Sequence, residues 1–293
     1  MDNACRTEIE QEIADALGSA PVAMRWTPVG GGDINAAYRL TGERGSWFIK
    51  LNRPERLAMF EAEAEGLQAM AAADGPRVPA PLTRGVAGGR SYLVMEWIEL
   101  RSRGDAAALG TQLAGLHGRT AERHGWHRDN TIGTTDQPNP PDHDWVRFYR
   151  DQRLRFQLEL AGRNGLDRRL QARGEALADR MAAFFSGYTP VPSLLHGDLW
   201  TGNVGFDSAG QPVLYDPAVY FGDRESDIAI SELFGRLPAA AYEAYNAAWP
   251  LDAGYPVRRD LYQLYHVLNH ANLFGGPYAG EALAMMDRLL AQV

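Results

Sequence analysis

The period of the hydrophobic pattern changes near residue 98, and this change restricts the chain to a fold with two unlike parts. Three segments read as strands: 34–40, 46–51 and 91–98. A helical pattern over 57–67 lies between them, and after residue 98 helical spacing dominates. Separate sheet and helical parts indicate an α+β fold. We expect a small antiparallel-sheet lobe over residues 1–98 and a larger, mostly helical lobe over 99–293.

Composition excludes several classes of protein. The chain has 29 Lys and Arg against 37 Asp and Glu, a formal net charge of −8, so no broad nucleic-acid surface is expected. Cys5 is the only cysteine, which excludes an intrachain disulfide and a cysteine metal cluster. The N-terminus lacks the apolar core of a signal peptide, and no run of about 18 apolar residues appears. We therefore expect a cytoplasmic protein without a membrane partner; the oligomeric state is left open.

Lysine occurs once, at Lys50, so 28 of the 29 basic residues are arginines. A glycine-rich segment precedes it, made of Gly30, Gly31, Gly32 and Asp33. Glycines let backbone amides approach a phosphate, although such a segment is more often a simple turn. On the following helix, Glu63 lies near the inward stripe, whereas Glu61 and Glu65 point elsewhere. A strand lysine paired with a helix glutamate can hold nucleotide phosphates; a solvated acidic helix face is the alternative.

The strongest motif is His196–Asn203 (HGDLWTGN), followed by Asp216 after a short strand pair. In phosphoryl transfer an aspartate at the position of Asp198 receives or orients the proton of the substrate hydroxyl. An asparagine five residues later, Asn203, and a later aspartate hold Mg²⁺ against the phosphates. Because these residues follow the glycine segment, lysine and glutamate in the order that this chemistry uses, we predict an ATP- and Mg²⁺-dependent kinase.

Motifs along nearly the whole chain extend this interpretation. They are Gly30–Asn35, Met59–Leu67, Asn130–Asn139, Asp144–Phe148, Arg153-Leu154, Leu194–Asn203, Tyr215–Ala218, Tyr220–Glu225 and Leu268–His270. With these motifs the chain resembles the fructosamine (ketosamine) kinases, within the protein-kinase-like small-molecule kinases that include aminoglycoside phosphotransferases. The resemblance implies a bilobal protein-kinase-like fold, joined near residues 96–101. The motif HGDLWTGN followed by YDPA is the more specific part of the match.

The resemblance also implies roles for individual residues. Asp198 is the implied catalytic base, Asn203 and Asp216 the implied Mg²⁺ ligands, and Lys50 with Glu63 the implied phosphate clamp. The implied adenine-binding hinge is the run Met95, Glu96 and Trp97. Some family members carry a cysteine in the glycine loop where this chain has Asp33, which puts redox control of the loop in doubt here.

The implied acceptor is a ketosamine, the adduct of a sugar with an amine, either as a free small molecule or on a glycated protein lysine. The implied reaction phosphorylates a sugar hydroxyl, the 3-hydroxyl by resemblance, and thereby labilises the sugar–amine linkage. The preferred sugar (fructosamine, ribulosamine or erythrulosamine) is left open. A kinase for another hydroxylated amine, such as an aminoglycoside, and a non-catalytic nucleotide-binding module are alternatives. A hydrolase with metal bound by His196 and Asp198 is a third, and it lacks further histidine ligands at suitable spacing.

Three further residues are candidates for binding the acceptor. Trp200 lies two residues after Asp198 and can stack on the sugar or the aglycone, with buried packing as an equal alternative. Asp223 and Glu225 follow the metal-binding aspartate closely and can meet a cationic amine, with a solvated acidic run as the alternative. For Asp227, a structural role at a helix N-terminus is expected.

Overall fold

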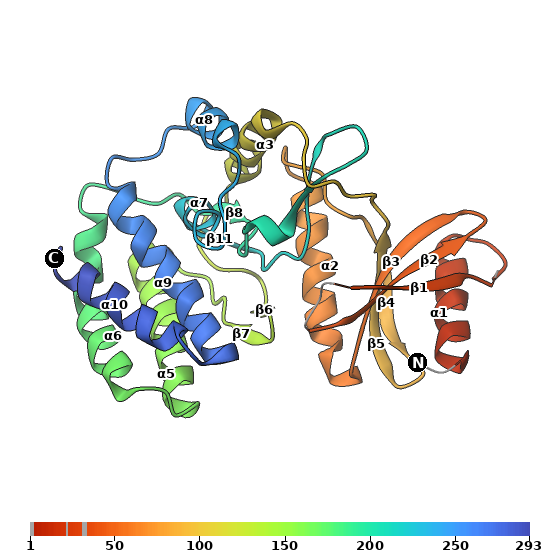
Figure 1. Cartoon of the computed structure of the whole chain (residues 1–293), viewed down its shortest axis with the longest axis horizontal. Helices are drawn as coiled ribbons and strands as arrows, with labels where there is room; N and C mark the ends of the chain where they lie inside the picture. The colour runs from red at the N-terminus through yellow and green to blue at the C-terminus, as the bar shows by residue number, and fades with distance from the viewer. Residues whose placement is uncertain (1–2, 22, 31–33) are drawn as a thin grey trace.

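The computed structural model describes residues 3–21, 23–30 and 34–293, which form two lobes side by side (Figure 1). The N-terminal lobe has a five-stranded antiparallel sheet in the order β1-β2-β3-β5-β4. Its strands are β1 (Arg25–Val29), β2 (Ala36–Gly42), β3 (Gly45–Asn52), β4 (Pro81–Ala87) and β5 (Arg90–Glu96). Its helices are α1 (Asn3–Ala16) and α2 (Leu57–Ala71), and α2 lies on the side of the second lobe. The expected α+β, bilobal architecture is confirmed.

Alternation along the strands explains why this sheet carries a helix on each face. Successive side chains of a strand point to opposite faces. In β3, Ile49 and Leu51 pack in one cluster with α1, whereas Lys50 between them reaches α2. In β5, Val94 joins the α1 cluster and Leu93 joins the larger core beneath α2. The single lysine is therefore buried on the face of the sheet that is turned toward the second lobe.

The sheet contains two strands that the hydrophobic pattern did not predict, β1 and β4. Both are edge strands, and neither is buried along its length. β1 contains Pro28 and β4 begins with Pro81. An edge strand tolerates proline because its outer backbone amides need no partner in the sheet. Its half-exposed side chains also lack a clear apolar alternation, and this explains why the pattern does not reveal it.

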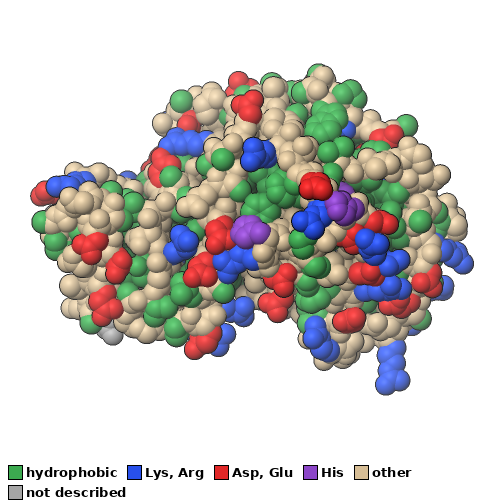
Figure 2. Space-filling model, turned by 180° about the vertical axis from the view of Figure 1, so that it is seen from behind, with side chains coloured by type: hydrophobic (Ala, Val, Ile, Leu, Met, Phe, Trp, Pro, Cys, Tyr) green, Lys and Arg blue, Asp and Glu red, His purple; other side chains and the backbone are tan. Residues whose placement is uncertain are grey.

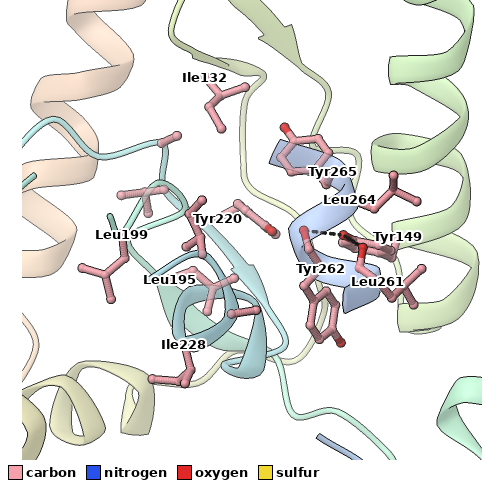
Figure 3. Close-up of a cluster of buried hydrophobic side chains, with 14 of the residues drawn as sticks. Ile132, Tyr149, Leu195, Leu199, Tyr220, Ile228, Leu261, Tyr262, Leu264 and Tyr265 are labelled. Atoms are coloured by element: carbon pink, nitrogen blue, oxygen red, sulfur yellow. Dashed lines mark hydrogen bonds between the residues drawn. The ribbon is translucent and has the colours of Figure 1, made fainter. Parts of the chain in front are cut away.

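The C-terminal lobe is mostly helical. Its α-helices are α3 (Ala106–Gly118), α4 (Trp145–Tyr149), α5 (Phe156–Arg163), α6 (Arg168–Arg180), α7 (Glu225–Ile230), α8 (Ala239–Ala248), α9 (Tyr255–Phe274) and α10 (Tyr278–Leu290). Its two-stranded sheets pair β6 (Asn130–Ile132) with β7 (Thr135–Gln137), β8 (Ser193–Leu195) with β11 (Tyr220–Gly222), and β9 (Val204–Phe206) with β10 (Pro212–Leu214). Figure 3 shows Leu195 and Tyr220 of the β8–β11 pair in one buried cluster with Tyr262 and Tyr265 of α9. This core fixes the segments on either side of the catalytic motif.

A π-helical segment, Arg150–Arg155, lies between α4 and α5. A π-helical turn often marks a functional position in a helix. Here the buried Arg153 donates hydrogen bonds to the carbonyl of Pro138 at 2.7 Å and to Asn139 Oδ1 at 2.6 Å. The Gly- and Pro-rich stretch 125–143 is anchored to the lobe by this arginine.

The surface carries charges of both signs. On the face shown in Figure 2, acidic and basic side chains are interspersed over both lobes, and a notch separates the lobes at the lower edge. Among the described residues, none of the helices is both long and apolar enough to cross a membrane. The proposed lobe boundary at residue 98 falls in the segment between β5 and α3.

Candidate active site

Lys50 is the centre of an ion-pair network that joins the two lobes. Its Nζ donates to Glu63 Oε1 of α2 at 2.6 Å and to Asp216 Oδ1 of the C-terminal lobe at 2.5 Å. Burial alone would lower the pKa of Lys50, but the Asp216 and Glu63 carboxylates outweigh it and hold this pKa above its usual value. Lys50 is therefore a buried, permanent cation, and the pairing of Lys50 with Glu63 expected from the sequence is present.

Asp216 has an unusual backbone conformation for a residue with a side chain. Its φ is 57°, in the left-handed region that favours glycine. Such a conformation persists where the surroundings impose it, and it occurs often at functional sites. The side chain is 49% exposed although it contacts the buried Lys50. One side of this carboxylate is therefore open to a ligand.

Asp198 and Asn203 lie together in the loop between β8 and β9. Asn203 Nδ2 donates to the Asp198 carbonyl at 2.9 Å, to Asp198 Oδ2 at 3.1 Å and to the Asp216 carbonyl at 3.5 Å. Burial and, to a smaller extent, the charge of Asp216 raise the pKa of Asp198 to about 7. A base with a pKa near neutrality is well suited to take a proton from a hydroxyl group. The structure thus brings Asp198, Asn203 and Asp216 together.

Asp227 fixes the backbone at the start of this loop. Its carboxylate accepts hydrogen bonds from the backbone amides of His196 at 2.7 Å and Gly197 at 2.9 Å, and it lies 3.2 Å from His117 Nε2. Burial alone would raise the pKa of Asp227, but the contact with His117 keeps it below its usual value. Asp227 therefore has a structural role, as expected, but this role is to bind backbone amides of another segment and not to cap the N-terminus of its own helix.

The ring of His196 has a partner at each nitrogen. Nδ1 accepts from the Asp198 amide at 3.2 Å and Nε2 lies 3.0 Å from the Tyr215 carbonyl. Both nitrogens are used to shape the loop, which argues against the metal-dependent hydrolase. Gly197 has a φ of 82°, and a Cβ there would lie 2.0 Å from the Ala218 carbonyl. Only glycine fits this position.

The expected hinge lies where β5 leaves the sheet. Met95 is buried in the core, whereas Glu96 and Trp97 are half-buried. The Glu96 amide donates to the Ala80 carbonyl at 2.8 Å and the Trp97 amide to the Ser46 carbonyl at 3.3 Å. The glycine-rich segment begins at the exposed Gly30, directly after β1. Its remaining expected residues, Gly31, Gly32 and Asp33, lie outside the described residues.

The sequence of the whole chain matches one family of enzymes. The family model for fructosamine kinase matches residues 5–292. A probable ketoamine kinase from Synechocystis is 42% identical over 96% of each chain. The chloroplastic protein-ribulosamine 3-kinase of Arabidopsis thaliana is 43% identical over 93% of this chain and 85% of its own length.

The chain belongs to the fructosamine kinase family. It is accordingly a phosphotransferase whose acceptor is a sugar hydroxyl. A crystal structure of a fructosamine-3-kinase homologue from Haemophilus somnus superimposes with a TM-score of 0.88 at 28% identity, over 96% of both chains. An aminoglycoside phosphotransferase in complex with ADP and hygromycin B is 15% identical, with a TM-score of 0.61 over 97% of this chain. The second likeness shows only that the two kinases share a fold.

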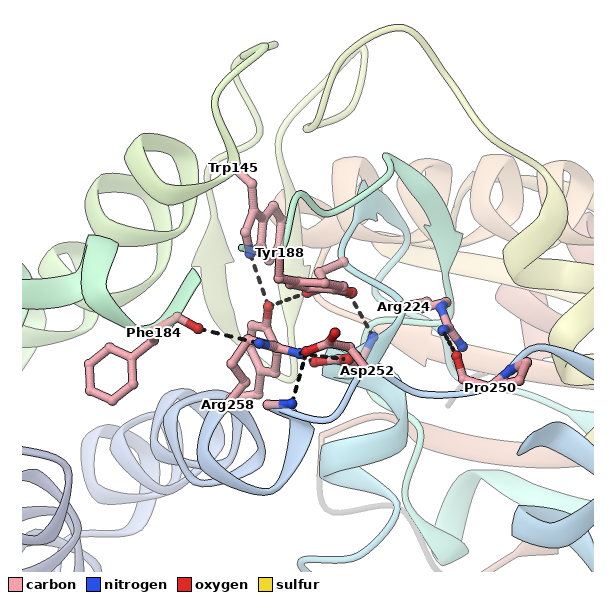
Figure 4. Close-up of polar contacts among 11 residues, drawn as sticks. Trp145, Phe184, Tyr188, Arg224, Pro250, Asp252 and Arg258 are labelled. Atoms are coloured by element: carbon pink, nitrogen blue, oxygen red, sulfur yellow. Dashed lines mark hydrogen bonds and ion pairs between the residues drawn. The ribbon is translucent and has the colours of Figure 1, made fainter. Parts of the chain in front are cut away.

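Two residues expected at the acceptor site lie elsewhere. Asp223 and Glu225 are both 0% exposed. Asp223 accepts hydrogen bonds from Tyr188 at 2.9 Å and Tyr262 at 2.5 Å, and Glu225 accepts from Arg258 Nε at 2.7 Å. Figure 4 shows Tyr188 and Arg258 in this buried network. The prediction that these carboxylates meet the acceptor is therefore wrong, because a buried charge with protein partners is closed to a ligand.

Trp200 is exposed in the loop between β8 and β9 that carries Asp198 and Asn203. Its side chain is among the large apolar groups left accessible, with 36% exposure. The indole covers Gly202, where a Cβ would lie 2.2 Å from the ring. The alternative of buried packing is therefore wrong, and the tryptophan faces solvent two residues after Asp198.

The sequence patterns did not identify a histidine that lies close to Asp198. His266 Nδ1 of α9 is 4.0 Å from Asp198 Oδ1, and burial lowers the pKa of His266 to about 3, so the ring is neutral.

One turn later, His270 is surrounded by aromatic rings, with centroids of Phe234, Phe274 and Tyr278 at 4.3, 5.5 and 5.2 Å. Phe274 is 62% exposed. The spacing of four residues between the two histidines was the available signal.

Proposed function

We propose that this protein transfers the γ-phosphoryl group of ATP to a sugar hydroxyl of a ketosamine, and that the acceptor is the 3-hydroxyl. The observation that carries the proposal is the joining of Lys50 to both Glu63 and Asp216, with Asp198 and Asn203 beside them. This arrangement gathers a phosphate-binding cation, metal-binding oxygens and a base at one interface between the lobes. The names of the relatives support the ketosamine as the acceptor class.

Lys50 would bind the nucleotide phosphates in this proposal, and the glycine-rich segment Gly30–Asp33 would cover them. Met95, Glu96 and Trp97 would bind the adenine where β5 leaves the sheet. The donor set suits Mg²⁺, which prefers oxygen ligands. Asp216 offers a half-exposed carboxylate. The side-chain nitrogen of Asn203 donates to the Asp198 carbonyl, so the side-chain oxygen of Asn203 is available to bind the metal. Bound Mg²⁺ would neutralise charge on the phosphates.

Asp198 would accept the proton of the attacking hydroxyl. Its pKa of about 7 lets it exchange that proton near neutral pH. Asn203 orients the carboxylate through its bond to Oδ2, and Asp227 fixes the loop backbone. The residues of the chain thus position the acceptor oxygen and remove its proton, which is the contribution a kinase can make to this reaction.

The amine of the ketosamine would bind to aromatic side chains instead of the buried Asp223 and Glu225. A ketosamine carries a secondary amine that is protonated at neutral pH. Aromatic faces attract a cation by about 0.5–2 kcal/mol, depending on desolvation. Trp200 is exposed beside the base, and Phe274 is exposed one turn beyond His270 on α9. These rings would contact the amine and its substituent while Asp198 holds the sugar hydroxyl.

A screen of ATP consumption tests the proposal. We expect the purified protein with Mg²⁺ to consume ATP in the presence of ribulosamine, erythrulosamine or fructosamine adducts, and phosphorus NMR to find the phosphate on the sugar 3-position. Glycated lysine in a peptide, compared with the free adduct, would show which form is preferred. A protein active on aminoglycosides but inactive on every ketosamine would contradict the proposed acceptor class.

A further inference from the structure

Helix α2 presents different faces to Lys50 and to the C-terminal lobe. At about 100° per residue, Glu61 and Glu65 share one face of the helix, whereas Glu63 lies about 200° from Glu61. Glu63 contacts Lys50. The face that carries Glu61 and Glu65 contacts the stretch 125–143 of the other lobe. The same helix is therefore held from two sides by two lobes.

Arg128 makes the main contacts to this second face. Its Nη1 donates to Glu65 Oε1 at 3.0 Å, and its Nη2 lies 3.3 Å from Glu61 Oε2 and 3.5 Å from the Ala58 carbonyl. His127 Nε2 lies 3.0 Å from Glu65 Oε2. Arg128 and Glu65 are each 28% exposed, so water screens them less than a fully exposed pair. We call Arg128, His127, Glu61 and Glu65 the α2 latch.

Hydrogen bonds connect the α2 latch to buried residues of the C-terminal lobe. The Arg128 carbonyl accepts a bond of 3.3 Å from Asn139, and Asn139 Oδ1 accepts a bond of 2.6 Å from the buried Arg153. Nearby, Asn130 Nδ2 donates to the Val219 carbonyl at 2.8 Å. Val219 lies three residues after the proposed metal ligand Asp216. The stretch that holds α2 therefore also supports the segment that follows this ligand.

We propose that the α2 latch sets the position of α2, and thereby the fraction of molecules in which Glu63 holds Lys50 ready for the nucleotide phosphates. Arg128 is accordingly a positioning residue. The inference rests on the proposed function, because it treats Lys50 as the phosphate ligand. Without Arg128, Glu61 and Glu65 become two like charges one turn apart, which repel each other. The helix then keeps its packing against the other lobe and the contact of Glu65 with His127, but loses both ion pairs with Arg128.

Steady-state kinetics of Arg128→Met test the proposal, because methionine keeps an apolar stem and removes the charge. We expect the KM for ATP to rise about five- to tenfold, with kcat and the KM for the ketosamine unchanged. Arg128→Lys, which keeps a charge for Glu65, should recover part of the loss. Arg147→Met is the matched control, since it removes an exposed arginine from its partner Asp142 within the same lobe. It should leave both KM values unchanged.

Amide hydrogen exchange over residues 57–71 gives a readout that does not depend on activity. Exchange should be faster in Arg128→Met than in the parent and in Arg147→Met. A fall in kcat with both KM values unchanged would indicate loss of folded protein and would overturn the proposal, as would an unchanged KM for ATP with unchanged exchange. If the parent consumed no ATP with any ketosamine, the proposed function would fail, and the exchange result would still decide whether the latch positions α2.

Discussion

Asp198→Asn is expected to lower kcat for ketosamine phosphorylation by about 10²–10⁴-fold, the usual contribution of a positioned proton acceptor. Asparagine retains a carbonyl oxygen that can accept the 3.1 Å bond from Asn203, so the loop should keep its shape. It cannot accept the proton of the acceptor hydroxyl at neutral pH. The affinity for ATP should stay near that of the parent, because Lys50 and its partners are unchanged.

Initial rates and calorimetric titration with ATP together check this prediction. The exposed Asp136→Asn provides a control for the same chemical change outside the site, and it should behave like the parent. Turnover of Asp198→Asn within a few-fold of the parent would remove Asp198 as the base. Loss of ATP binding along with turnover would instead place Asp198 in nucleotide binding.

The second large effect is expected for Lys50→Arg. The side chain is buried, with carboxylates of Glu63 and Asp216 at 2.6 and 2.5 Å from Nζ. Arginine keeps the charge, but its planar guanidinium needs more room and a different geometry. A charge-assisted hydrogen bond from Lys50 to a nucleotide phosphate would contribute about 1.5–3 kcal/mol, so we expect its loss to lower kcat/KM for ATP by about ten- to hundredfold.

Thermal unfolding must accompany that measurement, because disturbing a buried ion pair also destabilises the fold. The comparison is informative in this chain, since every other basic residue is already arginine. A folded Lys50→Arg variant with parental kcat/KM would show that the site needs only a positive charge. The interpretation of the single lysine would then be wrong.

Much of the fold and of the catalytic centre could be predicted because local patterns encode them. The period-2 alternation of β3 places Lys50 opposite Ile49 and Leu51, so its burial beside α2 follows from the strand itself. The spacing within His196–Asn203 likewise brings Asp198 and Asn203 together in one short loop. Contacts within a segment of this kind can be deduced from sequence distance alone.

The acceptor site could not be predicted in the same way. The position of Asp223 and Glu225 after Asp216 suggested exposure, but their burial depends on Tyr262 and Arg258, which come from a helix more than thirty residues later. No spacing rule reveals such long-range partners.

The same holds for the contacts that join distant segments elsewhere. Arg128 meets α2 across the boundary between the lobes, and His266 reaches Asp198 from α9. In each case a tertiary contact, and not a local pattern, decides what the residue does.

We infer that the acceptor is a ketosamine and that the protein recognises it through its amine. The direct measurement is kcat/KM for a ketosamine and for the same ketose without the amine, at low and high salt. Cation–aromatic contacts of about 0.5–2 kcal/mol predict a preference of about two- to thirtyfold for the ketosamine, with little dependence on salt. Equal kcat/KM values for the two acceptors would rule out recognition through the amine and would indicate a general sugar kinase.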